Sequence, residues 1–536
     1  MRLSLVALAV AATCGSAVAQ TSPLIIDQGR ADRTPPAPAS MGPPVRAPAA
    51  TMTIRMIDLF VLNEVRLEGT TLNPNLIGEA TQPFIGQRID GPALQRITDA
   101  IAAAYERSDI ALYTITAPDQ NFQGGVLTLR AIEYHLEGVD VTDDRGRDMS
   151  LVRGYAAKLN AEQPLRKRTL QRYVSLIRDI PGATPNIQLT PGMQPNANRL
   201  SVGLGQKRMQ LGLNVNNSGS DLLGRYILQG DVYFYGLLRQ GEQTRFTYAT
   251  EPGFSRFHYF AFSETQPIGS NGTQLQFNAG LLKTKPKGTS IRGEAVTMQL
   301  LASHPLIRSY NQNLYVSGSI DGVNSENAVL GQSLANERVR TIRLASSYTR
   351  TNARNAFGLA GTLSFGLDSL GARQPNPLLA VSDFFKLNGQ AGFSQQLAAP
   401  LFGRLRVTGQ YSGDRLPTSE LVAFGGGDFG RVFPAAAIVG DAGAAGVAEL
   451  AYRPPGLGAT LQGSELYLFA DRERTWYKSR LVAEQRFDLS SVGIGTRVAV
   501  GTGTLLQLEV ANVLDAPAFV ADAGDWRFAF GFRSNY

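Results

Sequence analysis

The sequence has little of the chemistry that enzymes and metal proteins use. Its one cysteine, Cys14, lies in an N-terminal stretch that we expect to be removed, so neither a disulfide nor a thiol site is predicted for the mature chain. Its three histidines, His135, His258 and His304, are scattered and lack the spacing of metal ligands. No nucleophile stands beside a base. We therefore predict no catalytic residue, no metal site and no cofactor.

Long apolar runs are missing as well. Beyond the N-terminal stretch the sequence has no run of about 18 apolar residues, which excludes membrane-spanning helices. A mean hydropathy of −0.09 is still compatible with a transmembrane β-barrel, because its strands alternate apolar and polar residues. The net charge of +7 is modest for 536 residues, and nucleic acid is not expected as a partner of an exported chain.

The N-terminus has the features of a secretory signal peptide. A basic start at Arg2 precedes an apolar run over residues 3–12, and the small residues Ala17 and Ala19 stand where such peptides are cleaved. We predict a signal peptide over residues 1–19. Residues 20–56 are rich in proline and alanine and are predicted to form an extended linker, since such a segment cannot bury a core.

Residues 57–133 and 134–206 each have the pattern of a small α+β domain. In the first, Leu94, Ile97 and Ile101 recur at helical spacing within a predicted helix. The first domain is predicted to have strands at 60–69, 112–116 and 126–132 and a helix at 92–107. The second is predicted to have strands at 133–141, 186–190 and 199–204 and helices at 150–159 and 166–179.

Residues 207–536 have the pattern of strands separated by turns. In the stretch from Met209 to Val215 apolar residues alternate with Gln, Gly and Asn, and similar stretches recur to the end of the chain. About 330 residues at roughly 20 residues per strand and connection predict about 16 membrane-crossing strands. A large soluble sandwich or propeller is the alternative, but it would need a partner surface for the aromatic faces.

The C-terminal stretch is the strongest single signal for a barrel. Phe528, Phe530 and Phe532 share one face of a strand, and Tyr536 ends the chain. In a transmembrane barrel such a face meets lipid, and a terminal aromatic lies at the membrane interface. We predict that these four residues form the membrane assembly signal of an outer-membrane β-barrel, with outer-membrane lipid and the barrel-assembly machinery as partners.

Several motifs carry a resemblance to one family. They are VRLEG at 65–69, PDQNFQGGVL at 118–127, LIRDIPG at 176–182 and NSGSDLLGR at 217–225. With these motifs the chain resembles the two-partner secretion transporters, the haemolysin-activator and filamentous-haemagglutinin transporter family. The resemblance implies a barrel of about 16 antiparallel strands preceded by two periplasmic POTRA domains, with POTRA 1 at 57–133 and POTRA 2 at 134–206.

The resemblance also implies a lid loop folded back into the pore, near residues 424–446. In this family the loop carries an arginine in a V-R-G-[FY] motif. The sequence FGGGDFGRVF at 424–433 supplies Arg431 and Phe433 for the arginine and the aromatic residue, although the two neighbours of the arginine depart from the motif. A literal VRGY at 152–155 lies inside a predicted helix of the second domain and is interpreted as ordinary helix surface.

The family arginine pairs with an aspartate on the inner wall, and Asp471 is the matching candidate. Leu466 and Leu468 suit the lipid face of a strand, so Asp471, on the opposite parity, is expected to face the lumen. The resemblance thus predicts an Arg431 to Asp471 pair that fixes the lid loop. The glycines of 425–430 also fit GxGxxG, but no helix follows them, and a nucleotide site is not predicted.

The function that the resemblance implies is translocation of an unfolded partner exoprotein from the periplasm to the cell surface. The client would be of adhesin, haemagglutinin or haemolysin type, captured by the POTRA domains. An assembly insertase of the same superfamily and a passive porin or nutrient receptor are the alternatives. The basic run Arg166, Lys167, Arg168 and Arg172 is interpreted as a solvated helix face, with contact to the client or to lipid headgroups as the alternative.

Overall fold

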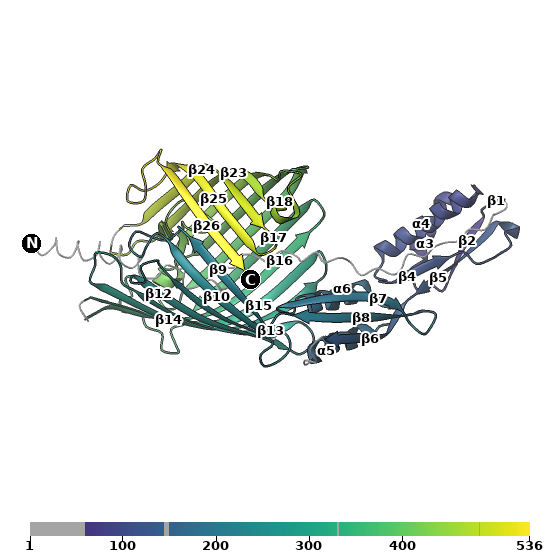
Figure 1. The fold of residues 1–536 in the computed structure, drawn as a ribbon, viewed down its shortest axis with the longest axis horizontal. Helices are drawn as coiled ribbons and strands as arrows, with labels where there is room; N and C mark the ends of the chain where they lie inside the picture. The colour runs from purple at the N-terminus through teal and green to yellow at the C-terminus, as the bar shows by residue number, and fades with distance from the viewer. Residues whose placement is uncertain (1–58, 144–148, 330–331, 482) are drawn as a thin grey trace, which may run out of the picture.

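The computed structural model describes residues 59–143, 149–329, 332–481 and 483–536. Two small α+β domains extend in line from one end of a large β-barrel (Figure 1). The predicted signal peptide and linker lie outside the described residues. No helix in the described part of the chain is both long and apolar enough to cross a bilayer.

The first domain is a three-stranded sheet covered by helices. Its strands have the order β2-β5-β4, with β2 parallel to β5 and β4 antiparallel to it. The elements are β1 (Phe60–Val61), β2 (Glu64–Glu68), α3 (Pro74–Thr81), η1 (Gln82–Phe84), β3 (Arg88–Ile89), α4 (Gly91–Arg107), β4 (Tyr113–Thr116), η2 (Gln123–Gly125) and β5 (Val126–Glu133).

Helix α4 follows the predicted helical spacing. Its residues Leu94, Ile97 and Ile101 are buried against the sheet, and Asp90 caps its N-terminus by accepting a hydrogen bond from the Ala93 amide. The single strand predicted over 60–69 is instead split into β1 and β2, because β1 leaves the main sheet to pair with β3. Helix α3 was not predicted, since its eight residues include a glycine and few apolar positions.

The second domain repeats this topology with the sheet order β6-β8-β7. Its elements are β6 (His135–Asp143), α5 (Ser150–Asn160), α6 (Lys167–Arg178), β7 (Ala183–Pro191) and β8 (Ala197–Gln206). The VRGY string lies in α5, but Val152 and Tyr155 are buried in the domain core rather than on the helix surface as predicted. Helical periodicity at 150–159 places these two residues on the inner side of the helix.

Two residues of the basic run, Lys167 and Arg172, contact the first domain and the barrel, so their interpretation as a solvated face is corrected, whereas the side chains of Arg166 and Arg168 are 51% and 73% exposed. The Lys167 ammonium donates to the carbonyls of Glu106 and Ser108 at the end of α4, at 2.8 and 3.0 Å. Arg172 donates to the carbonyl of Asn271 in a barrel turn, at 2.9 Å, and to that of Pro305 near the end of a barrel strand, at 2.8 Å. Carbonyl groups at a helix end or a turn are natural acceptors for these cations.

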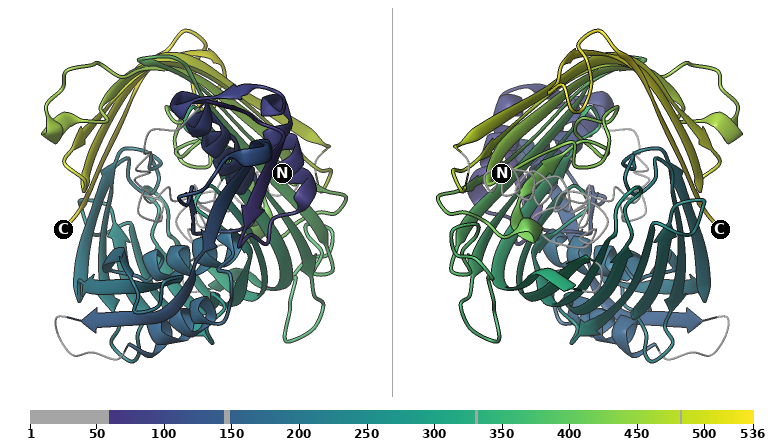
Figure 2. Two further views of the ribbon diagram at one scale, coloured as in Figure 1. Left: turned by 90° about the vertical axis from the view of Figure 1, so that its right-hand side faces the viewer. Right: turned by 90° about the vertical axis from the view of Figure 1, so that its left-hand side faces the viewer.

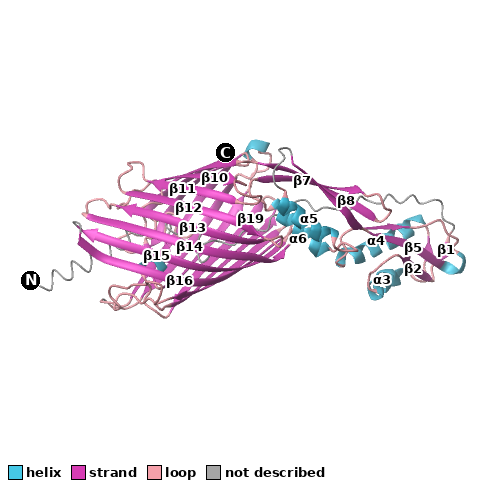
Figure 3. Cartoon of the chain, turned by 90° about the horizontal axis from the view of Figure 1, so that it is seen from below, coloured by secondary structure: helices cyan, strands magenta, loops and turns pink. Residues whose placement is uncertain are grey.

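A further ion pair ties the second domain to the barrel. Arg308 donates to both carboxylate oxygens of Asp179, each at 2.6 Å, and the arginine side chain is almost fully buried. We call the barrel end that carries these contacts the proximal end and the opposite end the distal end. Figure 3 shows the α-helices confined to the two small domains at the proximal end.

The barrel is a closed antiparallel sheet of sixteen strands (Figure 2). Its strands are β9 (Met209–Asn216), β10 (Ile227–Tyr235), β11 (Gln243–Thr250), β12 (Phe257–Ile268), β13 (Thr273–Thr284), β14 (Ile291–Arg308), β15 (Gln312–Val329), β16 (Gln332–Thr351), β17 (Asn355–Gly366), β18 (Phe385–Ala398), β19 (Leu401–Ser412), β22 (Ala442–Tyr452), β23 (Glu465–Tyr477), β24 (Gln485–Val500), β25 (Thr504–Asp515) and β26 (Trp526–Asn535). The predicted fold class, a barrel of about 16 strands after two α+β domains, is confirmed.

The strands alternate as the sequence predicts, with apolar residues outward. On β23, Leu466 and Leu468 are exposed on the outer face, whereas Tyr467 and Phe469 are buried inside. The same alternation on β26 places Phe528 and Phe532 outward, opposite the outward residues of β25 and β9. This outer apolar surface is what a bilayer covers.

Strand β26 closes the barrel against β9 over a short register. Residues 531–535 pair with 212–216, and the Tyr536 backbone exchanges hydrogen bonds with Leu211 at 2.8 and 3.1 Å. The Asn217 side chain extends the seam by pairing with the backbone of Phe530 and Phe528. The terminal residue is therefore part of the closing strand pair, and its side chain is exposed.

The connection from β19 to β22 is the longest in the barrel, and we call residues 413–441 the inner loop. It contains η3 (Thr418–Glu420), β20 (Val422–Phe424) and β21 (Ile438–Gly440), and the last two strands pair with each other. The predicted lid boundary near 424–446 is shifted, since residues 442–446 already belong to β22. One further short helix, η4 (Ala459–Leu461), lies in the connection from β22 to β23.

Candidate functional site

The inner loop packs against the inner wall of the barrel. Phe424, Phe433 and Ile438 are buried in one cluster with the inward-facing Tyr467 and Phe469 of β23. Aromatic and aliphatic side chains at these loop positions thus remove apolar surface from the lumen. The predicted aromatic residue Phe433 belongs to this cluster and is 1% exposed.

The glycine run of the loop is needed for its turn. Gly425 and Gly426 both have positive φ angles, of 111° and 69°. A Cβ atom on Gly425 would lie 2.2 Å from the carbonyl oxygen of Pro434, so only glycine fits there. Two of the three glycines of the GxGxxG string, Gly425 and Gly430 with its φ of 66°, thus have a structural explanation, since they let the loop fold back tightly on itself.

Arg431 projects from the loop tip onto the wall. Its Nη1 lies 2.9 Å from Glu449 Oε1 on β22 and 2.9 Å from Glu509 Oε1 on β25. The guanidinium carbon also lies 4.5 Å from the centroid of the Phe469 ring, a cation–π distance. The arginine is 7% exposed, so this contact is shielded from bulk water.

Asp471 faces the lumen side, as its parity predicts, but it does not pair directly with Arg431. Its Oδ1 accepts hydrogen bonds from the Ser491 amide at 2.9 Å and the Ser491 hydroxyl at 2.6 Å. The expected arginine to aspartate pair is replaced by the pairs of Arg431 with Glu449 and Glu509. The register of β22 to β25 brings these two glutamates under the loop tip. That register cannot be predicted from the sequence of any one strand.

The wall beneath the tip is a network of alternating charges. Glu449 and Glu465 are each paired with Arg497, at 2.9 and 2.8 Å, and Glu465 is also paired with Arg404 at 2.6 Å. A second contact from the loop tip joins this network, since Arg406 Nη1 lies 2.6 Å from an Asp428 oxygen. Mutual pairing allows these charges to remain ionised on a partly dry wall.

The stem of the inner loop is anchored separately, through Glu420. Its Oε1 lies 2.8 Å from Arg343 Nη2 on β16, and its Oε2 lies 2.6 Å from Lys386 Nζ on β18. Arg343 also pairs with Asp321 on β15 at 2.8 Å. The side chains of Glu420 and Lys386 are 0% exposed and that of Arg343 is 1% exposed.

Sequence reasoning missed this second anchor. The available signal was parity, because Arg343 and Lys386 each stand next to an outward leucine and so had to face inward. Nothing local pointed to Glu420 as their partner, since it comes from a loop far along the chain.

The base of the inner loop is closed by Asp441. Both of its carboxylate oxygens accept from Arg480, at 2.8 and 2.9 Å, and Oδ1 also accepts from the Leu416 amide at 2.7 Å. Such a bidentate arginine pair fixes geometry as well as charge. The two ends of the loop are thus held together at the distal end of the barrel.

The anchors divide the barrel into a covered and an uncovered wall. Along the strand order, β16 and β25 are seven positions apart among sixteen strands, so the loop contacts span nearly half of the circumference. On the remaining wall, Gln276 donates to Ser263 and Asn278, and Asn278 donates to Gln299. Gln299 in turn donates to Asp321, which connects this polar ladder to the stem anchor.

The site has the charged and aromatic residues of a docked loop rather than of a reaction centre. Over the ranges that the structure describes, no group of three or more His, Cys, Asp or Glu side chains is arranged to hold a metal ion. The contacts of Arg431 and Glu420 are ion pairs and stacking contacts, which can form and break without covalent chemistry.

Comparison with known proteins gives matches along most of the chain. The family described as haemolysin secretion/activation protein ShlB/FhaC/HecB matches residues 203–498, and the POTRA domain of ShlB type matches residues 60–133. The heme/hemopexin transporter protein HuxB of Haemophilus influenzae is 20% identical over 454 residues, which cover 81% of this chain and 79% of that protein.

Two solved structures have a similar fold. CdiB from Escherichia coli superposes with a TM-score of 0.69 at 17% identity and covers 94% of each chain. CdiB from Acinetobacter baumannii superposes with a TM-score of 0.62 at 15% identity, covering 90% of this chain and 91% of that one. At these identities the two structures support the fold alone.

Proposed function

Because the chain belongs to the haemolysin secretion/activation (ShlB/FhaC/HecB) family of outer-membrane transporters with periplasmic POTRA domains, we propose that it moves an unfolded partner exoprotein from the periplasm to the cell surface. The proximal end of the barrel, which carries the POTRA domains, then faces the periplasm and the distal end faces the cell exterior. The observation that carries the proposal is the inner loop, held in the lumen by ion pairs beside a wall of amide and hydroxyl groups.

The uncovered wall suits an unfolded chain as cargo. Its ladder of Gln276, Asn278 and Gln299 offers donors and acceptors that match peptide groups of any sequence. A fitted small-molecule site would instead use a few fixed polar groups in an apolar pocket. We therefore assign the translocation path to the side of the lumen lined by β12 to β15.

The gate in this proposal is the tip of the inner loop. Arg431 makes its hydrogen bonds through Nη1, and its Nε and Nη2 atoms have no hydrogen-bond partner within the described part of the chain. Both oxygens of Glu420, by contrast, are paired with buried cations. The tip is thus held less completely than the stem, so the tip, with Arg431 and Phe433, leaves the wall while Glu420 keeps the stem in place.

Asp471 supports the gate indirectly. By accepting two hydrogen bonds from Ser491 it ties β23 to β24 beneath the loop tip. The rings of Tyr467 and Phe469, on the same strand, receive the guanidinium of Arg431.

Capture of the client is assigned to the POTRA domains. In the second domain β7 is an outer strand of its sheet, and its exposed residues Thr184, Asn186 and Gln188 are polar. An extended segment of the client can add to such an edge through backbone hydrogen bonds. HuxB is named for heme and hemopexin, but the client of this chain is proposed only as a large secreted protein of adhesin, haemagglutinin or haemolysin type.

A secretion assay in the native host tests this function. Deleting the gene is expected to abolish surface display of one exoprotein, while the levels of other outer-membrane barrels stay normal. If many unrelated barrels were lost together, the chain would be an assembly insertase. If no exoprotein were lost and uptake of a solute fell, it would be a passive porin or receptor.

A further inference from the structure

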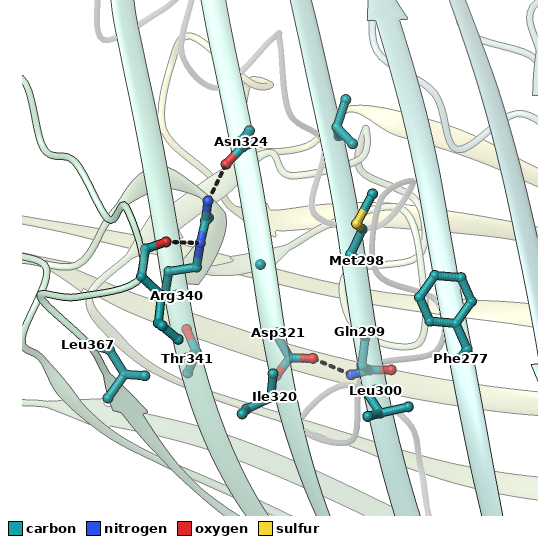
Figure 4. Close-up of a pocket in the computed structure, with 13 residues that line it drawn as sticks. Phe277, Met298, Gln299, Leu300, Ile320, Asp321, Asn324, Arg340, Thr341 and Leu367 are labelled. Carbon is teal, nitrogen blue, oxygen red and sulfur yellow. Dashed lines mark hydrogen bonds between the residues drawn. The ribbon is translucent and has the colours of Figure 1, made fainter.

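A shallow groove lies on the outer face of the barrel, across β14, β15 and β16. Its volume is about 320 Å³, and its floor includes the outward side chains of Met298, Leu300 and Ile320. Figure 4 shows these apolar side chains on β14 and β15 and Arg340 on the neighbouring β16, with its guanidinium next to Asn324. The groove therefore has an apolar body and one cationic end.

The register of the three strands explains this shape. Met298, Gly322 and Arg340 are aligned across β14, β15 and β16. Gly322 has no side chain between the other two, and the Arg340 guanidinium lies over it, with Nη1 3.6 Å from where a Cβ would stand. The missing side chain creates the groove, and the arginine closes one end of it.

Arg340 is positioned at the outer membrane interface. It lies eleven residues from Thr351, the proximal end of β16. At about 3.3 Å per residue and a tilt of about 40°, that is a rise of about 28 Å, against an apolar band of about 25 Å. On its proximal side the next outward residues of β16, Ile342 and Leu344, are apolar, as hydrocarbon requires, so the guanidinium stands where lipid headgroups of the outer leaflet begin.

The positive charge at this point is not neutralised by the protein. Arg340 donates to the carbonyl of Leu370 at 3.1 Å and to Asn324 Oδ1 at 2.9 Å, and Arg338 is the next outward residue on the same strand. Neither arginine takes part in an ion pair with any described residue. The outward carboxylates of the two neighbouring strands, Glu294 and Glu326, pair with each other one outward position beyond Arg338 and two beyond Arg340, toward the exterior.

We propose that this groove binds a phosphorylated glycolipid of the outer leaflet, with an acyl chain along Met298 and Ile320 and a phosphate on Arg340 and Arg338. Guanidinium groups bind phosphate through charge-assisted, often paired hydrogen bonds. Basic pockets beside a membrane-embedded surface are typical sites for anionic headgroups. The inference concerns the outer face of the barrel and does not depend on the proposed secretion function.

Native mass spectrometry of the full-length, delipidated protein in detergent tests the site. The probes are bisphosphorylated lipid A, its dephosphorylated form and phosphatidylethanolamine, with inorganic phosphate as competitor. The parent protein is expected to retain bisphosphorylated lipid A in preference to the other two lipids. Arg340→Gln should weaken that binding by about tenfold, because the charged donor is lost.

Two further variants separate charge from shape. Ile320→Ala should weaken binding of bisphosphorylated lipid A by removing part of the apolar floor while every charge stays in place. Arg350→Gln, at an exposed outward position at the proximal end of the same strand, should bind lipid A as the parent does. Heat-modifiable mobility on gels establishes that each variant is a folded barrel.

Three results would overturn the proposal. One is equal binding of lipid A by Arg340→Gln and Arg350→Gln. Another is equal retention of the dephosphorylated lipid, which would leave only a nonspecific apolar contact. The third is displacement of lipid A by millimolar inorganic phosphate, which would indicate a free-anion site.

Discussion

Arg343 on β16 and Glu420 in the inner loop form an ion pair of 2.8 Å in which both side chains are at most 1% exposed. This pair joins a strand near the middle of the barrel sequence to a loop that begins three strands later. Lys386 completes the contact, so removal of the glutamate charge takes away a carboxylate that two buried cations share, and Arg343 keeps only its pair with Asp321 among the ion pairs described.

Glu420→Gln is expected to destabilise the loop stem by on the order of 3 kcal/mol, since the carboxylate shared by two buried cations is lost. The variant should show larger and noisier conductance than the parent in planar bilayers. Glu326→Gln, which changes an exposed glutamate on the outer face, is the matched control and should conduct like the parent. Parent-like conductance of Glu420→Gln would show that the stem is held by other contacts.

Arg431→Ala is expected to raise pore conductance and lower client secretion, because the loop tip loses its contacts to β22 and β25. Glu509→Gln should reproduce much of this effect. Asp471→Asn should have a smaller effect, since the aspartate bonds Ser491 rather than the arginine. Single-channel recordings of the three variants, with secreted client measured in parallel, test whether the effects on conductance and secretion are larger for Arg431→Ala and Glu509→Gln than for Asp471→Asn. A larger effect for Asp471→Asn than for Glu509→Gln would show that Asp471, rather than Glu509, holds the loop tip.

Loss of the terminal aromatic residue is expected to impair assembly. Tyr536→Ser removes an exposed interfacial side chain at the closing strand pair, and deletion of the residue also removes two backbone hydrogen bonds to Leu211. Folded barrel in the outer membrane should therefore fall for both variants, more steeply for the deletion. The control is Phe519→Ser, an exposed aromatic in a distal connection. Heat-modifiable mobility and abundance in membrane fractions give the measurement.

Client capture at β7 predicts a position-specific crosslink. A photo-crosslinking residue at Gln188 in the full-length chain should form an adduct with the client's N-terminal region during secretion, because β7 is an outer strand. The same residue at Glu79, exposed on α3 of the first domain, is the control and should crosslink weakly. Equal crosslinking at both positions would place recognition elsewhere than at this edge.

Much of the fold follows from local sequence pattern alone. Alternation from Phe528 to Phe532 and from Met209 to Val215 predicts strands with one lipid-facing side, because side-chain direction in a strand depends only on parity. The spacing of Leu94, Ile97 and Ile101 predicts α4 in the same way. Parity also places Asp471 on the inner side of β23, and all of these expectations agree with the structure.

What the tertiary structure decides is which of these correctly oriented side chains meet. Arg431 contacts Glu449 and Glu509 because the registers of four neighbouring strands bring two glutamates beneath the loop tip, ahead of Asp471. Register is set by the summed pairing of many strands and by closure of the barrel, so no single segment encodes it. The same holds for the anchor of Glu420 and for the contacts that Lys167 and Arg172 make between domains. In each case a charged group pairs with a residue far away in the sequence, which comes within reach only when the chain is folded.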